Sequence, residues 1–209
     1  MVLAGIKVVD TPLVHDAMEL ARHSSEPYLF NHAMRSWLFG VLIAEAAKPV
    51  PDPELLAVSA ILHDLGLTDR YSAHERFEVD GANAARSFLN ERGIPAHQIQ
   101  LVWDAIALHT TFSIALHKEP EVAMTHSGIS VDVIGAGLDR IPQDKVRAVL
   151  AEFPRLAMKK QFQERLCGLV RQKPATSFDN VLRDIGIRHV AGYTAPSFAD
   201  FLENAPFAE

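Results

Sequence analysis

The sequence predicts an all-α fold built as a single domain over residues 1–209. Nearly every segment with a repeating apolar pattern repeats at helical spacing. A proline or a capping residue stands where most of these segments begin. No stretch has the alternation of a good strand, no pair of stretches has a hairpin signal, and no shift in composition marks a domain boundary.

The first three helices are predicted from the residues that open and close them. Thr11 is the expected N-cap of the first helix, with Pro12 at its first position. Pro27 opens the second helix, which is expected to run to about Lys48 and to be buried, because it is apolar almost all round. A proline-rich break follows, and Asp52 is then the expected cap of a third helix that ends in a His-Asp doublet.

In the rest of the chain, proline and glycine again mark where the expected helices begin and end. Further helices are expected over about 77–92, 95–109, 121–137, 142–154, 156–172, 178–187 and 197–202. The stretch 128–134 is the weakest of these predictions, because its β-branched residues also suit a strand. Polar loops are expected over about 67–75 and 113–120.

Composition and charge exclude several classes of function. Hydrophobic residues make up 48% of the chain and charged residues 22%, which is ordinary for a globular domain. The net charge is −6 without any basic block, so nucleic acid is not expected as a partner. No apolar run has the length of a membrane span, and the first residues lack the features of a signal peptide. With Cys167 as the only cysteine, no internal disulfide can form, and a cytoplasmic location is expected.

The doublet His63-Asp64 is the strongest functional signal in the chain. Three apolar residues lead into it and Gly66 follows closely, so the doublet is expected at the end of a helix and at the edge of the core. A carboxylate is costly to bury unless something pairs with it. Imidazole and carboxylate are both ligands for divalent metals. A metal ion is therefore the simplest partner, although a surface Asp beside a stacked His would explain the doublet alone.

Two further polar residues stand in apolar helical segments and have the same need for a partner. His32 lies on the second, most buried helix, and Asp132 is surrounded by β-branched apolar residues. One divalent ion bound by His32, His63, Asp64 and Asp132 would satisfy these burials together and leave room for water and substrate. The alternative is that each residue finds a separate hydrogen bond.

This order of ligands, His, then His-Asp, then Asp on a helical chain, resembles the HD-domain superfamily of metal-dependent hydrolases. The resemblance rests on Asn31-His32, on Leu62-His63-Asp64-Leu65-Gly66 and on Val131-Asp132-Val133. Two flanking segments, 76–82 and 102–110, look like those of the cyanamide hydratase-type HD proteins. The resemblance covers about residues 27–140 and implies an HD-type helical bundle, to which 141–209 would add supporting helices.

The resemblance implies a reaction and a cofactor. A hydratase-like member would add metal-activated water to a nitrile and give a urea-type product. Zinc is the first expectation for the metal, and manganese, cobalt, nickel and iron stay open because His and Asp sites accept several ions. An HD phosphohydrolase acting on nucleotides or other small phosphate esters is the alternative. A non-catalytic HD-fold ligand-binding module is the alternative from another class, and the complete ligand set argues against it.

Further residues are candidates for contact with substrate or for proton transfer. Asp64, His109 and His74 are the expected catalytic residues, and the two histidines, with His126 as a weaker third, lie where some HD proteins bind a second metal. Arg35, Thr110 and Glu78 are the expected substrate-binding residues. Arg35 has an alternative role as a structural ion-pair partner, and Glu78 as a charge at a helix N-terminus. The expected partner is a small-molecule substrate. A homo-oligomer is also considered, because homo-oligomers are common in this class.

Overall fold

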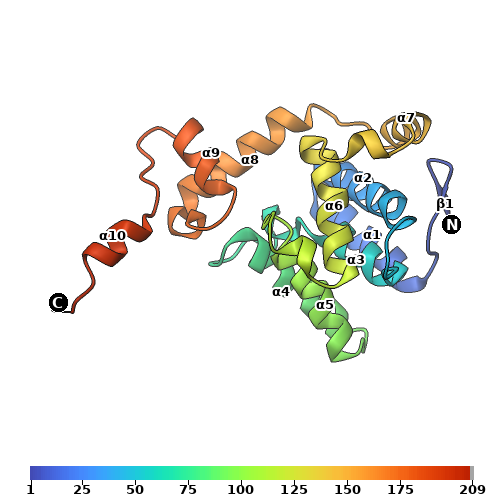
Figure 1. The fold of residues 1–209 in the computed structure, drawn as a ribbon, viewed down its shortest axis with the longest axis horizontal. Helices are drawn as coiled ribbons and strands as arrows, with labels where there is room; N and C mark the ends of the chain where they lie inside the picture. Colours follow the sequence, from blue (N-terminus) through green and yellow to red (C-terminus); the bar gives the residue numbers. More distant parts are fainter. Residues whose placement is uncertain (208–209) are drawn as a thin grey trace. The chain divides into compact units, whose positions relative to one another are not determined.

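The computed structural model describes residues 1–207 as a helical protein, which confirms the all-α prediction (Figure 1). The helices are α1 (Pro12–Ser24), α2 (Pro27–Ala44), α3 (Pro53–Leu62), α4 (Phe77–Asn90), α5 (Ala96–Ala107), α6 (Pro120–Ile134), α7 (Gln143–Glu152), α8 (Met158–Gln172), α9 (Leu182–His189) and α10 (Phe198–Glu203). Four 3₁₀ turns lie between some of these helices: η1 (Leu65–Leu67), η2 (Ala115–His117), η3 (Leu138–Arg140) and η4 (Pro174–Ser177). Among residues 1–207, no helix is both long enough and apolar enough to cross a bilayer.

The helix starts follow the capping residues that the sequence indicates. The Thr11 hydroxyl accepts a hydrogen bond from the Val14 amide at the start of α1. The Asp52 carboxylate accepts two from the first turn of α3. At the other end of a helix, Gly135 takes a left-handed φ of 76° and terminates α6. The β-branched stretch before Gly135 is helical, because tertiary packing buries most of it, up to Asp132, within α6.

A small hairpin at the N-terminus corrects the expectation that the chain has no hairpin. Strands β1 (Val2–Leu3) and β2 (Ile6–Lys7) pair in antiparallel register. Ala4 and Gly5 connect them with positive φ values of 49° and 70°, the pattern of a type I′ turn. Strands of two residues are too short to show an alternating pattern, which is why the sequence gives no sign of them.

The described chain divides into two compact units, where the sequence analysis takes one domain over 1–209. The first unit is Met1–Gln161, and the second begins at Phe162, inside α8. Residues 141–161 therefore belong to the same unit as the motif-bearing residues 27–140, and the remaining C-terminal residues form the second unit.

The core of the first unit is centred on α2, as its all-round apolar pattern predicts. Most of α2 is buried, and α6 packs along it. The two helices approach closely at Gly40 and Gly128: a Cβ on Gly128 would meet the Ser36 carbonyl oxygen and would lie 2.7 Å from the Gly40 nitrogen. This close approach brings His32 of α2 next to Asp132 of α6.

A second close approach holds the end of α3. A Cβ on Gly66, in η1, would collide with the Phe77 carbonyl oxygen and lie 2.8 Å from the Gly81 nitrogen of α4. Only glycine therefore lets α4 pack directly against the turn that follows the His63-Asp64 doublet. This turn, α2, α5 and α6 together surround the candidate site.

Candidate metal centre

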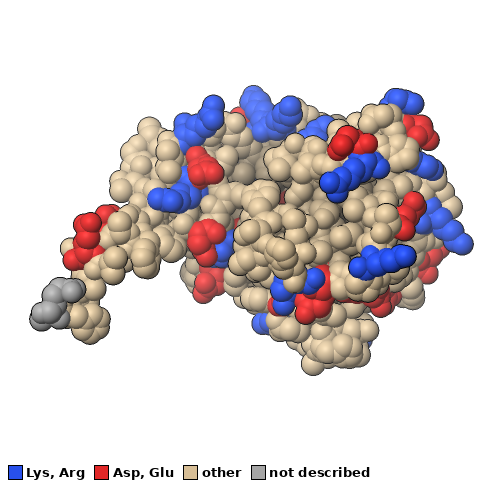
Figure 2. Space-filling model, viewed as in Figure 1, with Lys and Arg blue, Asp and Glu red and all other residues tan. Residues whose placement is uncertain are grey.

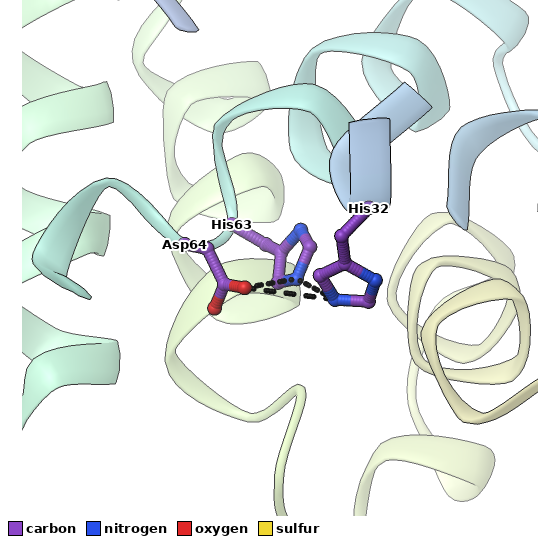
Figure 3. A group of neighbouring side chains, drawn as sticks. All are labelled: His32, His63 and Asp64. Atoms are coloured by element: carbon purple, nitrogen blue, oxygen red, sulfur yellow. Dashed lines mark hydrogen bonds and ion pairs between the residues drawn. The ribbon is translucent and has the colours of Figure 1, made fainter. Parts of the chain in front are cut away.

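His63 and Asp64 stand where α3 ends, as the sequence predicts. His63 is the C-cap of α3, and Asp64 leaves the helical conformation with φ of −101° and ψ of 15° before η1 begins. Both side chains are buried, with Asp64 4% exposed and His63 fully enclosed. The change of backbone direction at Asp64 lets the two adjacent side chains point to the same side, where His32 of α2 meets them (Figure 3).

The three side chains form a compact triangle of ligand atoms. The Nε2 atoms of His32 and His63 are 3.2 Å apart. Asp64 Oδ2 lies 3.5 Å from His32 Nε2 and 3.2 Å from His63 Nε2. Bonds of about 2.0–2.1 Å to a tetrahedral ion would place neighbouring ligand atoms about 3.4 Å apart. The triangle therefore has the dimensions of one face of a metal coordination sphere.

The hydrogen bonds of the imidazoles leave their Nε2 atoms as acceptors. His63 Nδ1 lies 2.8 Å from the Ala60 carbonyl oxygen, and His32 Nδ1 lies 2.7 Å from Asp132 Oδ2. Carbonyl and carboxylate oxygens only accept, so each Nδ1 carries the proton in the neutral ring. The two Nε2 lone pairs then face each other across 3.2 Å, beside a carboxylate oxygen. A shared cation would satisfy such a cluster of acceptors.

Asp64 gives the clearest test of whether the residues fit a metal. Both of its carboxylate oxygens are buried, and in the described residues neither accepts a hydrogen bond of acceptable geometry. An ionised carboxylate without such partners is costly to bury, and a bound cation removes that cost. The donor set of two imidazole nitrogens and one carboxylate suits zinc and related divalent ions. The residues therefore fit a divalent metal.

The electrostatics of the cluster agree with this interpretation. Burial raises the pKa of Asp64, but attraction by His63 outweighs burial and lowers the pKa to about 2. Burial lowers the pKa of His63, and the charge of Asp64 outweighs that effect and raises the pKa. For His32 burial dominates, so its pKa is lowered despite the hydrogen bond with Asp132. Asp64 is thus ionised at neutral pH and ready to bind a cation.

His109 lies on the other side of the Asp64 carboxylate. Its Nε2 is 3.8 Å from Asp64 Oδ1, and its ring meets that of His63 edge-on at 4.9 Å between centroids. Its Nδ1 donates to the Ile106 carbonyl oxygen at 2.6 Å, which leaves Nε2 as an acceptor. Burial, together with repulsion from His63, lowers the pKa of His109 to about 4. His109 thus lies beside the cluster, and its expected catalytic role stays a prediction.

Asp132 contacts Nδ1 of His32, on the other side of the ring from Nε2, and the structure does not gather it with the other three expected ligands. Its expected role as a ligand stays a prediction. His32, His63 and Asp64 form a cluster of metal-ligand geometry without Asp132. Asp132 instead accepts from His32 Nδ1 and forms a two-point ion pair with Arg35, at 2.7 and 2.8 Å. A carboxylate in this place fixes the tautomer and orientation of a metal-binding imidazole. The sequence shows that Asp132 is buried but not which nitrogen of His32 it meets.

Arg35 shows the arrangement that the sequence offered as its alternative role, a structural ion pair. It is fully buried, and besides Asp132 its guanidinium donates to the Phe153 carbonyl oxygen at 3.0 Å. The geometry thus gives no support to a substrate-binding role for Arg35, because its donors already face protein acceptors.

Glu78 and Thr110, two expected substrate-binding residues, meet next to His109. The Thr110 hydroxyl donates to Glu78 Oε1 at 2.5 Å, and Arg76 donates to both oxygens of the same carboxylate. Burial raises the pKa of Glu78, but the hydrogen bonds from Arg76 and the other neighbouring groups outweigh burial and lower it. Glu78 is therefore more than a charge at a helix N-terminus: it ties the start of α4 to the end of α5.

His74 and His126, the other histidines considered, take different positions. His74 is exposed on the loop before α4, and no contact joins it to the cluster among the described residues. The neighbouring Ala73 and Glu75 amides donate to Asp80, which holds this loop at the surface. The expectation of a catalytic His74 thus gains no support. His126 is buried, and its Nδ1 donates to the His109 carbonyl oxygen at 2.7 Å.

One residue that the sequence analysis missed is Arg155. Its guanidinium donates to the backbone oxygen and to Oδ1 of Asp132, each at 2.9 Å. Arg155 follows α7 in a stretch without any recognisable motif, and its partner lies 23 residues earlier in the chain. No local pattern signals such a contact.

Comparisons with known proteins show the family to which the region around this cluster belongs. A family model described as HD domain matches residues 29–150, which include all the residues of the cluster. The chain is 28% identical over 141 residues to the cyanamide hydratases DDI2 and DDI3 of Saccharomyces cerevisiae. Each alignment covers 65% of this chain and 62% of the relative. The chain thus spans less than two thirds of the length of these curated relatives.

Proposed function

Because the chain belongs to the HD domain family, we propose that it is a metal-dependent enzyme that adds water to a small molecule, with hydration of a nitrile such as cyanamide as its reaction. The observation that carries the proposal is the buried Asp64 carboxylate, without hydrogen bonds, beside two imidazole Nε2 atoms that are acceptors in the neutral rings. The similarity to two cyanamide hydratases supports the nitrile as substrate class.

His32, His63 and Asp64 are the side chains that would hold the ion. A divalent metal bound there supplies a Lewis acid that polarises a substrate and makes water easier to deprotonate. Zinc is the proposed ion, since two imidazoles and a carboxylate are the protein ligands of some catalytic zinc sites. Asp132 and the Ala60 carbonyl group orient the two imidazoles by accepting from their Nδ1 atoms.

His109 is the group placed to move the proton. Hydration of cyanamide adds the hydroxyl group of water to the nitrile carbon and the other hydrogen of water to the nitrile nitrogen, and tautomerisation of this isourea then gives urea. His109 is neutral at pH 7 with an unprotonated Nε2 near Asp64, so it accepts the proton from water and returns it to the nitrile nitrogen. Its hydrogen bond to the Ile106 carbonyl group keeps the ring in the tautomer that this role needs.

The charges around the site favour a small neutral substrate over a phosphate ester. Phosphoryl transfer develops negative charge that arginine or lysine stabilises. The three arginines described next to the site residues, Arg35, Arg76 and Arg155, are engaged by the carboxylates of Asp132 and Glu78. On the face of the molecule in Figure 2, basic and acidic side chains are intermingled rather than gathered in a basic patch. The phosphohydrolase alternative therefore has less support.

Urea release from cyanamide, by protein reloaded with zinc, is the experiment that tests the proposed reaction. We expect urea from the wild-type protein and none above background from His63→Ala, because this variant removes one of the ligands of the ion. Release by both proteins would place the chemistry elsewhere. If metal-replete wild-type protein releases no urea, nitrile hydration is wrong, and nucleoside monophosphates with manganese or cobalt become the next substrates to test.

The role of His109 leads to a separate prediction. His109→Gln is expected to lower kcat by about 100-fold, the usual contribution of a general acid–base group. The bound metal should stay close to the wild-type content, because His109 lies outside the triangle of ligand atoms. His74→Gln is the matched control: this histidine is exposed, and its kcat should not change. Metal loss in His109→Gln would show that His109 is a ligand rather than a proton carrier.

A further inference from the structure

The carboxylate of Asp132 is held by more donors than an ordinary buried ion pair. Arg35 donates through Nε and Nη2, Arg155 donates through Nη1, and His32 donates from the remaining side. Arg155 also donates to the backbone oxygen of Asp132, so it contacts both the side chain and the main chain of that residue. With so many directed contacts, Asp132 can occupy only one orientation, and so can the His32 ring that it binds.

Arg155 comes from the loop 153–158, which connects α7 to α8 and lies beyond the HD-matched residues 29–150. The loop has a specific backbone shape: Leu156 and Ala157, neither of them glycine, have positive φ values of 50° and 56°. Two such residues in succession are costly and persist only where surrounding contacts hold them.

The contacts that hold this loop lead back to the same site. The carbonyl oxygens of Phe153 and Pro154 accept from Arg35, and that of Pro154 also accepts from Asn31, next to the ligand His32. The Met158 sulfur is the acceptor for both guanidinium groups, at 3.1 Å from Arg35 and 3.4 Å from Arg155. The backbone of the loop thus accepts hydrogen bonds from the buried Arg35, and the loop's own Arg155 donates to Asp132.

We propose that Arg155 is a positioning residue of the metal centre, which acts through Asp132 on the orientation of His32. We call the loop 153–158 the clamp. It lies outside the HD-matched region, so metal affinity would depend on a residue that this region does not contain. The inference rests on the proposed metal centre, but it does not depend on the substrate. Arg155 is the informative residue of the two arginines, because its side chain is 32% exposed, whereas Arg35 is fully buried and its loss endangers the fold.

Metal affinity of Arg155→Ala is the test, measured by competition between the protein and a chromogenic chelator for zinc and for cobalt. We expect affinity to fall by about 10-fold, the lower end of the effect of losing a partner that orients a ligand. The visible absorption bands of the cobalt form should also change, because they report ligand geometry. Arg147→Ala is the matched control, since it removes the same charge from an exposed position on α7.

The outcomes separate this inference from the proposed metal centre itself. If wild-type protein binds neither ion, the metal centre is wrong. If the wild type, Arg155→Ala and Arg147→Ala bind with the same affinity and the same cobalt spectrum, the metal centre stands and the clamp is wrong. Thermal unfolding of the three chelator-treated proteins completes the test. If Arg155→Ala loses metal affinity only in proportion to its loss of folding stability, the positioning role is wrong. Recovery of affinity in Arg155→Lys would support it.

Discussion

Asp64→Asn is expected to abolish metal-dependent stabilisation of this protein. The substitution keeps the size of the side chain and removes the charge that attracts the ion. Loss of an orienting partner costs about 10- to 100-fold in metal affinity, so loss of a direct ligand should cost at least about 100-fold. At zinc of 100 times the wild-type Kd, the wild type gains about 2.7 kcal/mol on binding. The variant should then gain only about 0.4 kcal/mol.

Thermal unfolding of chelator-treated protein, with and without added zinc, measures this difference. Asp139→Asn is the matched control, because it removes the same charge from an exposed residue away from the cluster. The control should keep the full shift of the wild type. An equal zinc-dependent shift in Asp64→Asn and in the wild type would show that Asp64 does not bind the ion. It would also remove the explanation for its buried oxygens, which lack hydrogen bonds.

Gly128→Ala is expected to give a large loss of folding stability. Its new Cβ would meet the Ser36 carbonyl oxygen and the backbone of Gly40, and neither can move without shifting α2. Overpacking of this kind costs about 1–3 kcal/mol, and contact with backbone atoms places this variant at the upper end. The same shift would move His32 away from Asp132, so metal affinity should fall together with stability.

Urea denaturation gives the loss of stability directly. Gly168→Ala is the control: this helical glycine has open space around its Cβ position, so alanine should stabilise its helix by about 0.5–1 kcal/mol. Gly128→Ala with wild-type stability would mean that α2 and α6 do not pack as closely as the structure shows.

The helices of this protein could be predicted from local sequence. Thr11 and Asp52 cap helices through hydrogen bonds that reach only two or three residues ahead, so their effect is visible in the sequence itself. The doublet His63-Asp64 is local in the same sense, because adjacent residues at a helix end stay together in any fold. Two of the three residues of the His32, His63 and Asp64 cluster could therefore be placed together without the tertiary structure.

Contacts between distant residues were decided only by packing. Asp132 lies 100 residues after His32, and the side of the imidazole that it meets depends on how closely α2 and α6 approach at Gly128. Both residues could be identified as candidates because each is a polar residue in an apolar segment and needs a partner. This pattern does not show which atoms face each other. For this reason the sequence could not show that Asp132 meets Nδ1 of His32 rather than the cluster of Nε2 atoms.

The same reason separates His109 from His74 and explains why Arg155 was missed. No local spacing relates any of these three residues to the doublet. The packing of α4 and α5 decides that His109 is buried beside Asp64 and that His74 is exposed. By itself, the sequence determined the helices, the ligand types and the HD resemblance, because these depend on short spacings. The tertiary structure alone decided the arrangement around the cluster, because hydrogen bonds over long sequence separations form only where packed helices bring their atoms within about 3 Å.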